Sequence, residues 1–364
     1  MHNGVFLISG ATMSNGQKQD LVLEDGIIVE AGSSLSRAGS TKIDADGLIA
    51  LSGLVDLHTH LRDPGGEGSE TVLSGTRAAA AGGYTTTFAM ANTSPVADTA
   101  GVVEQVLSLG EEAGFVTVRP IGAVTQGLEG KQLAEIGAMA KSRAKVTVFS
   151  DDGKCVSDSL LMRRALEYVK GFNGVIAQHS QDPQLTLDAQ MNESALSSTL
   201  GLSGWPSVAE ESIIARDVLL AKHVGARLHV CHVSTAGSVE VIRWAKSRGI
   251  AVTAEVTPHH LMLSEELVRG YDSVYKVNPP LRSQEDILAL RQALADGVID
   301  IVATDHAPHK SEAKCCEWNY AAMGMVGLET ALPVVRTAMQ DYDFGWERLE
   351  QAMSHTPARI GRLS

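Results

Sequence analysis

Two histidines, His58 and His60, stand one residue apart at the end of an apolar run that begins at Leu54. In an extended strand the side chains alternate between two faces, so both imidazoles point to the same side. Neutral imidazoles suit zinc, and a bound zinc ion lowers the pKa of its water to roughly 7, which makes hydroxide available at neutral pH. Strand histidines also occur as hydrogen-bonded packing residues, so this pair alone leaves a metal site and a structural role open.

Other residues with metal-ligating side chains follow separate apolar runs. They are Asp152 after 146–150, His179 after 175–178, His232 after 228–231 and Asp305 after 301–304. A barrel of parallel strands brings the C-terminal ends of its strands to one rim, where six such side chains could hold one or two divalent ions. Asp305 could also take a proton from the attacking water and deliver it to the leaving nitrogen. The alternative for Asp305 is to cap the turn that follows it.

Strands must alternate with helices to position these residues. From Leu54 onward, eight segments, most of them rich in Val, Ile and Thr, predict buried parallel strands, with helical segments between most of them. The strand segments are 54–60, 84–90, 116–124, 145–150, 174–179, 227–234, 251–260 and 299–306. We therefore predict an α/β fold, a (β/α)8 TIM-type barrel over residues 51–364. Short strands and turns within residues 1–50 predict a small β appendage.

Local signals predict where individual elements begin and where long loops lie. Ser207 and Glu210 have the spacing of a capping box ahead of an amphipathic helix. The stretches 180–206 and 307–326 predict long loops on the catalytic side of the barrel.

For several other polar residues we expect a structural or solvent-facing role rather than a functional one. His259 and His260 stand at the end of the seventh strand segment, and we expect structural hydrogen bonds there rather than metal binding. The mixed charges of Lys310, Glu312 and Lys314 predict a solvated face of the second long loop.

Composition limits the classes of partner. The 364 residues are 44% hydrophobic and 20% charged, as in ordinary globular proteins, and the formal net charge is −13. This acidity argues against nucleic-acid binding, although a local cationic pocket could still take an anionic substrate. The four cysteines show no CxxC spacing, and neither a signal peptide nor a membrane-length apolar run is present. We expect a cytoplasmic protein that does not bind membranes.

Five segments resemble the signature of the dihydroorotases, a family of the amidohydrolase superfamily. They read HTHLRDPGG at 58–66, MANT at 90–93, NPPLR at 278–282, ATDHAPH at 303–309 and GLET at 327–330. The HxH pair is shared by the whole superfamily, but the five segments in this order are specific. The resemblance covers nearly the whole chain.

The resemblance implies an activity and a set of partners. Members interconvert L-dihydroorotate and N-carbamoyl-L-aspartate, a step of pyrimidine synthesis, by metal-assisted hydrolysis. One or two zinc ions per chain are implied, as are a homo-oligomer and a complex with aspartate transcarbamoylase.

The resemblance also implies roles for individual residues. The implied metal ligands are His58, His60, Asp152, His179, His232 and Asp305, with Asp305 also catalytic. The implied substrate contacts are Arg62, Asn92 and His309 for the carboxylate, Asn278 for the ring, and the backbone of Met323 and Gly324. An arginine fork matches a carboxylate through two charge-assisted hydrogen bonds, which makes the first assignment physically sensible. Arg62 would share the strand face of His60 if the strand geometry continued.

The chain departs from the family pattern in three places. Many relatives carry a carboxylated lysine at the end of the fourth strand, where this chain has Asp151 and Asp152. The choice of Asp152 comes from the family alignment, not from spacing. Many relatives also read His-x-Glu after the fifth strand, where Gln181 stands here, which puts the support of His179 in question. Relatives continue beyond the position of Ser364, so we expect the β appendage to be incomplete without a C-terminal tail.

Two other functions compete with this interpretation. A hydantoinase or allantoinase would open a related ring, but a substrate without an exocyclic carboxylate has little use for Arg62 beside the metal. A catalytically silent scaffold for aspartate transcarbamoylase has no need of six convergent ligands.

Overall fold

The computed structural model describes residues 4–363, and its first part is a small β-sheet. The strands are β1 (Val5–Met13), β2 (Lys18–Glu24), β3 (Ile27–Gly32), β4 (Thr41–Asp44) and β5 (Ile49–Ala50). The order is β3-β2-β1-β4, and β5 also pairs with β1. The β1–β2 and β2–β3 pairs are antiparallel, whereas β4 and β5 run parallel to β1.

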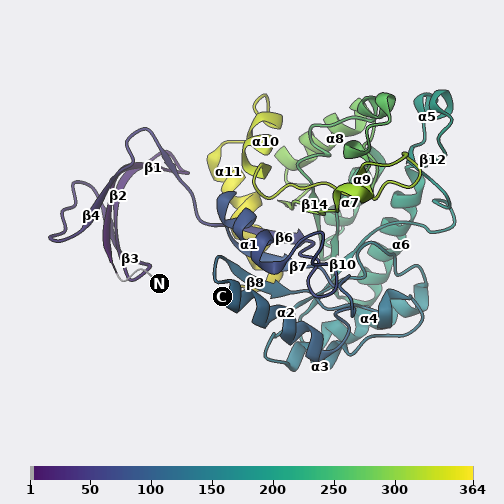
Figure 1. Cartoon of the computed structure of the whole chain (residues 1–364), viewed down its shortest axis with the longest axis horizontal. Helices are drawn as coiled ribbons and strands as arrows, with labels where there is room; N and C mark the ends of the chain where they lie inside the picture. Colours follow the sequence, from purple (N-terminus) through teal and green to yellow (C-terminus); the bar gives the residue numbers. More distant parts are fainter. Residues whose placement is uncertain (1–3, 364) are drawn as a thin grey trace.

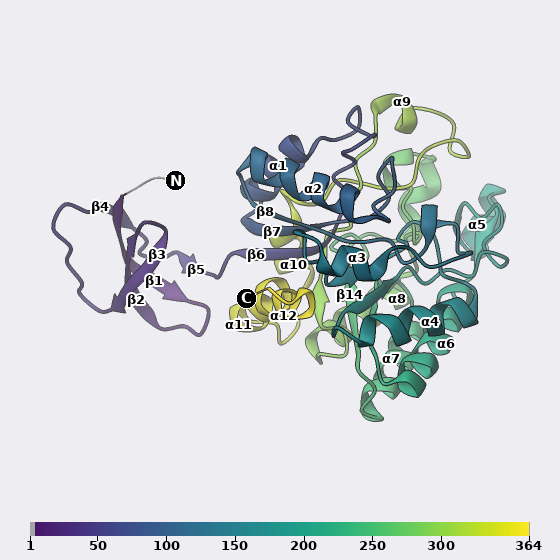
Figure 2. The same ribbon diagram turned by 90° about the horizontal axis from the view of Figure 1, so that it is seen from below.

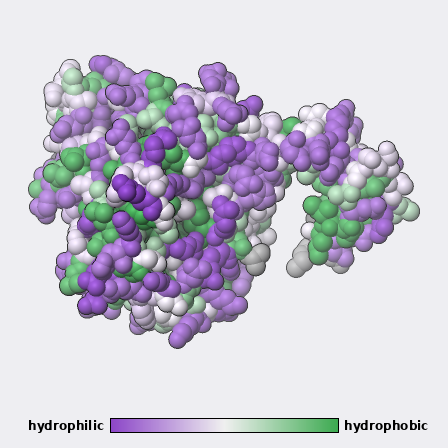
Figure 3. Space-filling view, turned by 180° about the vertical axis from the view of Figure 1, so that it is seen from behind, coloured by the Kyte–Doolittle hydropathy of each residue, from purple (hydrophilic) through white to green (hydrophobic). Residues whose placement is uncertain are grey.

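This sheet stands apart from the rest of the chain (Figures 1 and 2). Apolar side chains lie on its surface, where Ile27 and Ile28 are 67% and 57% exposed (Figure 3). Glu350 of the main body holds both the turn between β1 and β2 and the segment after β5, because its carboxylate accepts hydrogen bonds from the Ser14 hydroxyl and, at 2.7 Å, from the Ser52 amide. The backbone hydrogen bonds of the sheet are made between its own strands, so they do not depend on the main body.

The two larger sheets of the main body contain eight parallel strands. They are β6 (Leu54–Thr59), β7 (Tyr84–Ala89), β8 (Thr117–Pro120), β9 (Val148–Phe149), β10 (Val175–Gln178), β13 (Arg227–Val230), β14 (Val252–Val256) and β15 (Ile301–Val302). One sheet has the order β6-β7-β8 and the other β15-β14-β13-β10-β9. Isolated parallel bridges link the two sheets, Gly122 with Phe149 and Thr59 with His306. Each segment expected from the sequence therefore contains a strand, and the class is α/β with parallel sheets.

The strands end earlier than the sequence predicts. His232 and Asp305 follow their strands with φ angles of 29° and 47°, and Arg62 follows β6 with a φ of 59°. Positive φ is uncommon for residues with a side chain, and the backbone departs from regular strand geometry at these three positions. Apolar runs do not signal such conformations.

Helices surround the strands (Figure 1). The α-helices are α1 (Val72–Ala81), α2 (Ala100–Ala113), α3 (Ile136–Lys141), α4 (Ser159–Lys170), α5 (Ala195–Leu200), α6 (Val208–Val224), α7 (Ala236–Ser247), α8 (Gln284–Ala295), α9 (Ser311–Lys314), α10 (Ala331–Ala338), α11 (Trp346–Glu350) and α12 (Thr356–Gly361). Three 3-10 segments, η1 (Gln126–Leu128), η2 (Glu265–Gly270) and η3 (Ser273–Tyr275), and one π-helical turn, η4 (Gln351–His355), complete the set. Within residues 4–363, no helix combines the length and the apolarity needed to cross a bilayer.

The predicted capping box before α6 is wrong. Ser207 is itself helical and its side chain caps nothing. Glu210 is buried instead, and it accepts hydrogen bonds from the Ser234 amide at 3.0 Å and the Ser238 hydroxyl at 2.6 Å. The Glu210 carboxylate therefore stabilises the turn from β13 to α7. It does not cap the N-terminus of its own helix, α6.

The two long loops carry structure of their own. The stretch 180–206 contains α5 and a two-stranded sheet of β11 (Met191–Asn192) and β12 (Gly204–Trp205). The stretch 307–326 contains α9. Below the strand ends, an apolar cluster that includes Leu57, Phe88 and Ile121 fills the space between strands. This packed layer gives the polar residues at the C-terminal strand ends a rigid floor.

Candidate metal centre

Asp152 lies at the centre of a buried histidine cluster. Its Oδ1 atom is 3.3 Å from His58 Nε2, 3.3 Å from His179 Nδ1 and 3.2 Å from His232 Nε2. Its Oδ2 atom is 3.2 Å from His60 Nε2. Four histidines from three different strand ends thus converge on one carboxylate.

Asp305 completes the cluster on the side of His58 and His60. Its Oδ1 atom is 3.2 Å from His60 Nε2 and 3.5 Å from His58 Nε2. The structure therefore brings together all six side chains that the sequence singled out as ligands.

The donor atoms form two overlapping groups. His58, His60 and Asp152 offer ligand atoms within 4.8 Å of one another, and so do Asp152, His179 and His232. Asp152 belongs to both groups, as a carboxylate that bridges two ions would. The Nε2 atom of His58 is buried and has no hydrogen-bond partner among residues 4–363. Nitrogen and oxygen donors in this number, one of them without a partner, fit a divalent cation.

Electrostatics also favours a cation here. Burial opposes protonation of His58, but the carboxylates of Asp152, Glu255 and Asp305 outweigh it and raise the pKa of the imidazole well above its ordinary value. Burial likewise opposes ionisation of Asp305, yet His58 and His60 hold the pKa of its carboxyl well below the usual range. The three carboxylates therefore favour the positively charged form of His58 at this position.

Asp151 faces away from the cluster. Its carboxylate accepts hydrogen bonds from the backbone amides of Val124 and Thr125 at 2.7 and 2.9 Å, and from the Thr125 hydroxyl. It thereby fastens the segment after β8 to the end of β9, a structural role distinct from that of Asp152.

Glu255 supports the cluster from β14, and the sequence interpretation missed it. Its Oε1 atom is 2.6 Å from His58 Nδ1, and its Oε2 atom is 2.9 Å from His229 Nε2. The first contact fixes the His58 ring with Nε2 toward Asp152. Burial opposes ionisation of Glu255, but His58 and His229 lower its pKa to about 2. An acidic residue inside an apolar strand was the available signal.

Two amide side chains orient the other histidines. Gln181 Oε1 is 2.7 Å from His179 Nε2, so the glutamine makes the contact that its departure from the family pattern had put in question. Asn92 Oδ1 is 2.9 Å from His60 Nδ1. In both pairs the amide oxygen accepts from one ring nitrogen and leaves the other facing the cluster.

Arg62 reaches the site by another route than the one expected. Since β6 ends at Thr59 and the φ of Arg62 is positive, the residue does not continue the strand face of His60. Its Nε atom donates to the carbonyl of Pro308 at 3.3 Å, between Asp305 and His309 in the sequence. The guanidinium therefore lies against the loop that follows β15.

The remaining expected substrate contacts lie around the same loop. His309 Nε2 is 2.8 Å from the carbonyl oxygen of Met323. Gly324 has a φ of 142°, and a Cβ atom there would lie 2.9 Å from His309 Nε2 and 2.6 Å from the Ala307 carbonyl oxygen. This position therefore requires glycine. Asn278 donates to Gln181 Oε1 at 3.3 Å, while its own oxygen is buried without a partner among the described residues.

The expectations for two other groups hold only in part. His260 makes structural hydrogen bonds, to Thr257 Oγ1 at 2.8 Å and the Pro279 carbonyl oxygen at 3.1 Å. His259 Nε2, by contrast, is buried and has no partner in residues 4–363. Lys314 was expected in a solvated face, but the loop folds back over it and its ammonium donates to three backbone carbonyls.

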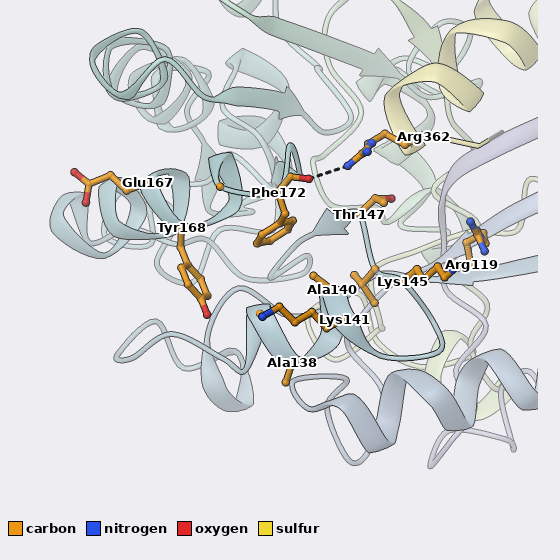
Figure 4. A pocket seen from close by; sticks show the side chains of 13 residues that line it. Arg119, Ala138, Ala140, Lys141, Lys145, Thr147, Glu167, Tyr168, Phe172 and Arg362 are labelled. Atoms are coloured by element: carbon orange, nitrogen blue, oxygen red, sulfur yellow. Dashed lines mark hydrogen bonds between the residues drawn. The ribbon is translucent and has the colours of Figure 1, made fainter.

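A cavity of about 1180 Å3 lies away from the histidine cluster (Figure 4). It is lined by Lys145 before β9 and by Phe172 after α4, so it belongs to the opposite ends of the strands. Lys141 stands in the last turn of α3, and Arg362 donates to the Phe172 carbonyl at 2.8 Å. The position of Lys141 is the one that a helix C-terminus favours for a cation.

Comparison with known proteins agrees with the motifs. A family model described as Dihydro-orotase-like matches residues 47–238. The dihydroorotase of Leifsonia xyli subsp. xyli is 72% identical over 365 residues, which cover 100% of this chain and 83% of the relative. The dihydroorotase of Mycobacterium tuberculosis is 52% identical over 350 residues, covering 96% of this chain and 81% of the relative.

Solved structures resemble the chain in fold. The L-hydantoinase of Arthrobacter aurescens matches with a TM-score of 0.86 and 24% identity, over 99% of this chain and 82% of that one. Fold and relatives together place the chain among the cyclic amidohydrolases. Within that class it belongs to the dihydroorotase family.

Proposed function

We propose that the chain is a zinc-dependent dihydroorotase, which reversibly hydrolyses the ring amide of L-dihydroorotate to N-carbamoyl-L-aspartate. The observation that carries this proposal is the convergence of six buried ligand side chains beside the loop that Arg62 contacts. We also infer that β6–β10 and β13–β15 close into a (β/α)8 barrel, and the two bridges between the sheets support this inference. Among the described residues, 4–50 then form a separate appendage.

In this proposal six residues hold zinc. His58, His60 and Asp305 would take one position, His179 and His232 the other, and Asp152 would serve both. Bound zinc would supply water with a pKa near 7 and polarise the substrate carbonyl. Glu255, Gln181 and Asn92 keep the histidine rings in the required orientation.

Asp305 moves the proton in the chemical step. It is ionised in this site, so it can accept a proton from the attacking water. The water oxygen bonds to the ring carbonyl carbon, the carbon–nitrogen bond breaks, and Asp305 delivers the proton to the leaving nitrogen. Ring closure follows the same path in reverse.

Arg62 distinguishes dihydroorotate from rings without a carboxylate. A substrate anion in a pocket of low dielectric needs a fixed cation, because an unpaired buried charge costs several kcal/mol. Arg62 supplies that cation, and Asn92 and His309 add polar contacts at its side. Asn278 and the backbone of Met323 and Gly324 meet the amides of the ring.

Turnover by zinc-loaded and chelator-treated protein tests the proposal. We expect ring opening of dihydroorotate and ring closure of N-carbamoyl-L-aspartate only with metal, and little turnover of hydantoin or allantoin. Faster turnover of hydantoin than of dihydroorotate by the loaded protein would favour the hydantoinase alternative. Metal analysis would distinguish one ion from two. Homo-oligomerisation and a complex with aspartate transcarbamoylase stay predictions that size-exclusion chromatography of the protein with and without that enzyme can test.

A further inference from the structure

The side chain of Lys314 runs into the loop that carries Met323 and Gly324. Its Nζ atom donates to the carbonyl oxygens of Ala322 at 2.9 Å, Gly324 at 3.0 Å and Lys276 at 3.2 Å. An ammonium has three protons, so these contacts use its full donor capacity.

The three carbonyls belong to backbone segments assigned to substrate binding. Ala322 and Gly324 flank Met323, whose carbonyl accepts from His309. Lys276 stands two residues before Asn278, and its carbonyl also accepts from the Gly324 amide at 2.9 Å. One ammonium therefore joins the loop after β15 to the segment of Asn278.

The environment shows that this ammonium is held for its hydrogen bonds. Within the described residues, Lys314 forms no ion pair with a carboxylate, and the hydrogen bonds of its ammonium go to backbone carbonyls. Burial, together with the nearby Lys276, lowers the pKa of Lys314 to about 8, while Asp272 and Cys316 act in the opposite direction. Lys276 does not share the contacts, because its own Nζ donates to the Trp318 carbonyl at 2.6 Å.

We propose that Lys314 is a positioning residue for substrate binding, which fixes the Met323–Gly324 backbone against the Asn278 segment. The inference rests on the proposed function, since those segments are assigned to the dihydroorotate ring. The backbone at Gly324 lies so close to Ala307 and His309 that a Cβ atom would clash, so its position bears directly on His309. Loss of the ammonium would release both segments while leaving the metal ligands in place.

Kinetics of Lys314→Met test the positioning role. We expect KM for dihydroorotate to rise about ten-fold, as for loss of a charged hydrogen-bonding group, with kcat and metal content nearly unchanged. Lys222→Met, which removes an exposed lysine from α6, is the matched control and should keep the wild-type KM. An unchanged KM in Lys314→Met would overturn the inference.

The pH dependence of KM gives a second test. With a pKa of about 8 in the folded protein, Lys314 loses a proton above that pH and retains only two donors for three carbonyls. KM of the wild type should therefore rise above pH 8, whereas Lys314→Arg, which stays charged, should show no such rise. The same rise in both proteins would contradict the assignment.

Amide hydrogen exchange separates this inference from the proposed function. In zinc-loaded protein without substrate, Lys314→Met should speed exchange at Ala322 and Gly324, and Lys222→Met should not. Failure of the wild type to turn over dihydroorotate would refute the proposed function only. Unchanged exchange at these two amides would refute the positioning role of Lys314, whatever the substrate is.

Discussion

The Nδ1 atom of His58 lies 2.6 Å from Oε1 of Glu255, which follows it by 197 residues. This contact fixes which ring nitrogen of His58 faces Asp152, and it joins β6 to β14 beneath the cluster. We expect Glu255→Gln to keep the fold and to weaken zinc binding by about 10–100-fold, the usual range for losing such a supporting partner. Competition with a chromophoric zinc chelator measures the effect.

A matched control is Glu240→Gln on α7, an exposed site that removes the same charge. Equal zinc affinity in Glu255→Gln and the wild type would show that the contact does not orient His58 for metal binding.

Glu255 also predicts how the metal-free protein responds to acid. Its pKa is lowered from an ordinary 4.5 to about 2, so its contribution to stability is complete above pH 4.5 and is lost as the pH falls through 2. Urea unfolding of chelator-treated protein should show a steeper loss between these pH values in the wild type than in Glu255→Gln. Parallel curves would mean that other carboxylates dominate the acid response.

Substitution of Asp152 should affect metal binding and activity, whereas substitution of Asp151 should affect stability. Asp152→Ala removes the carboxylate shared by both ligand groups, so metal and activity should be lost. Asp151→Ala leaves the amides of Val124 and Thr125 without their acceptor and should cost about 1–3 kcal/mol of stability for each orphaned donor. Metal analysis and thermal melting distinguish the two, and loss of metal in Asp151→Ala alone would reverse the assignment.

Arg62→Met tests the selectivity for a carboxylate. We expect kcat/KM for dihydroorotate to fall by the equivalent of about 2–5 kcal/mol, because the substrate anion loses its partner in a buried site. Dihydrouracil, which has no carboxylate, should be affected far less, and metal content should not change. Proportional losses for both substrates would assign Arg62 to the fold or the metal site instead.

The sequence identified the residues that act through their type and their place after an apolar run. Runs rich in Val, Ile and Thr identified eight strands, and His or Asp at the ends of five runs gave the cluster, with the choice of Asp152 over Asp151 taken from the family resemblance. The positive φ angles of His232 and Asp305 were not predictable, because neither residue type requires that conformation. Nor was the role of Glu255, since its contact with His58, 197 residues away, leaves no spacing in the chain.

Two errors have a common physical cause. Ser207 and Glu210 have the local spacing of a cap, and Lys314 lies in a mixed charged stretch, so each pattern predicted a solvent-facing role. In the structure Glu210 accepts from buried donors of the next unit, and Lys314 donates to partly buried backbone carbonyls. Several hydrogen bonds to protein groups can offset the free-energy cost of removing a charged side chain from water. Local sequence patterns do not reveal such long-range hydrogen bonds.

The sheet of β1–β5 is linked to the main body chiefly through Glu350, and much of its apolar surface is exposed (Figures 1 and 3). Two units that share so little buried surface need not melt together. Scanning calorimetry should therefore show two transitions, with a calorimetric enthalpy larger than the van't Hoff enthalpy of either. Zinc should raise the midpoint of only the transition that contains its ligands.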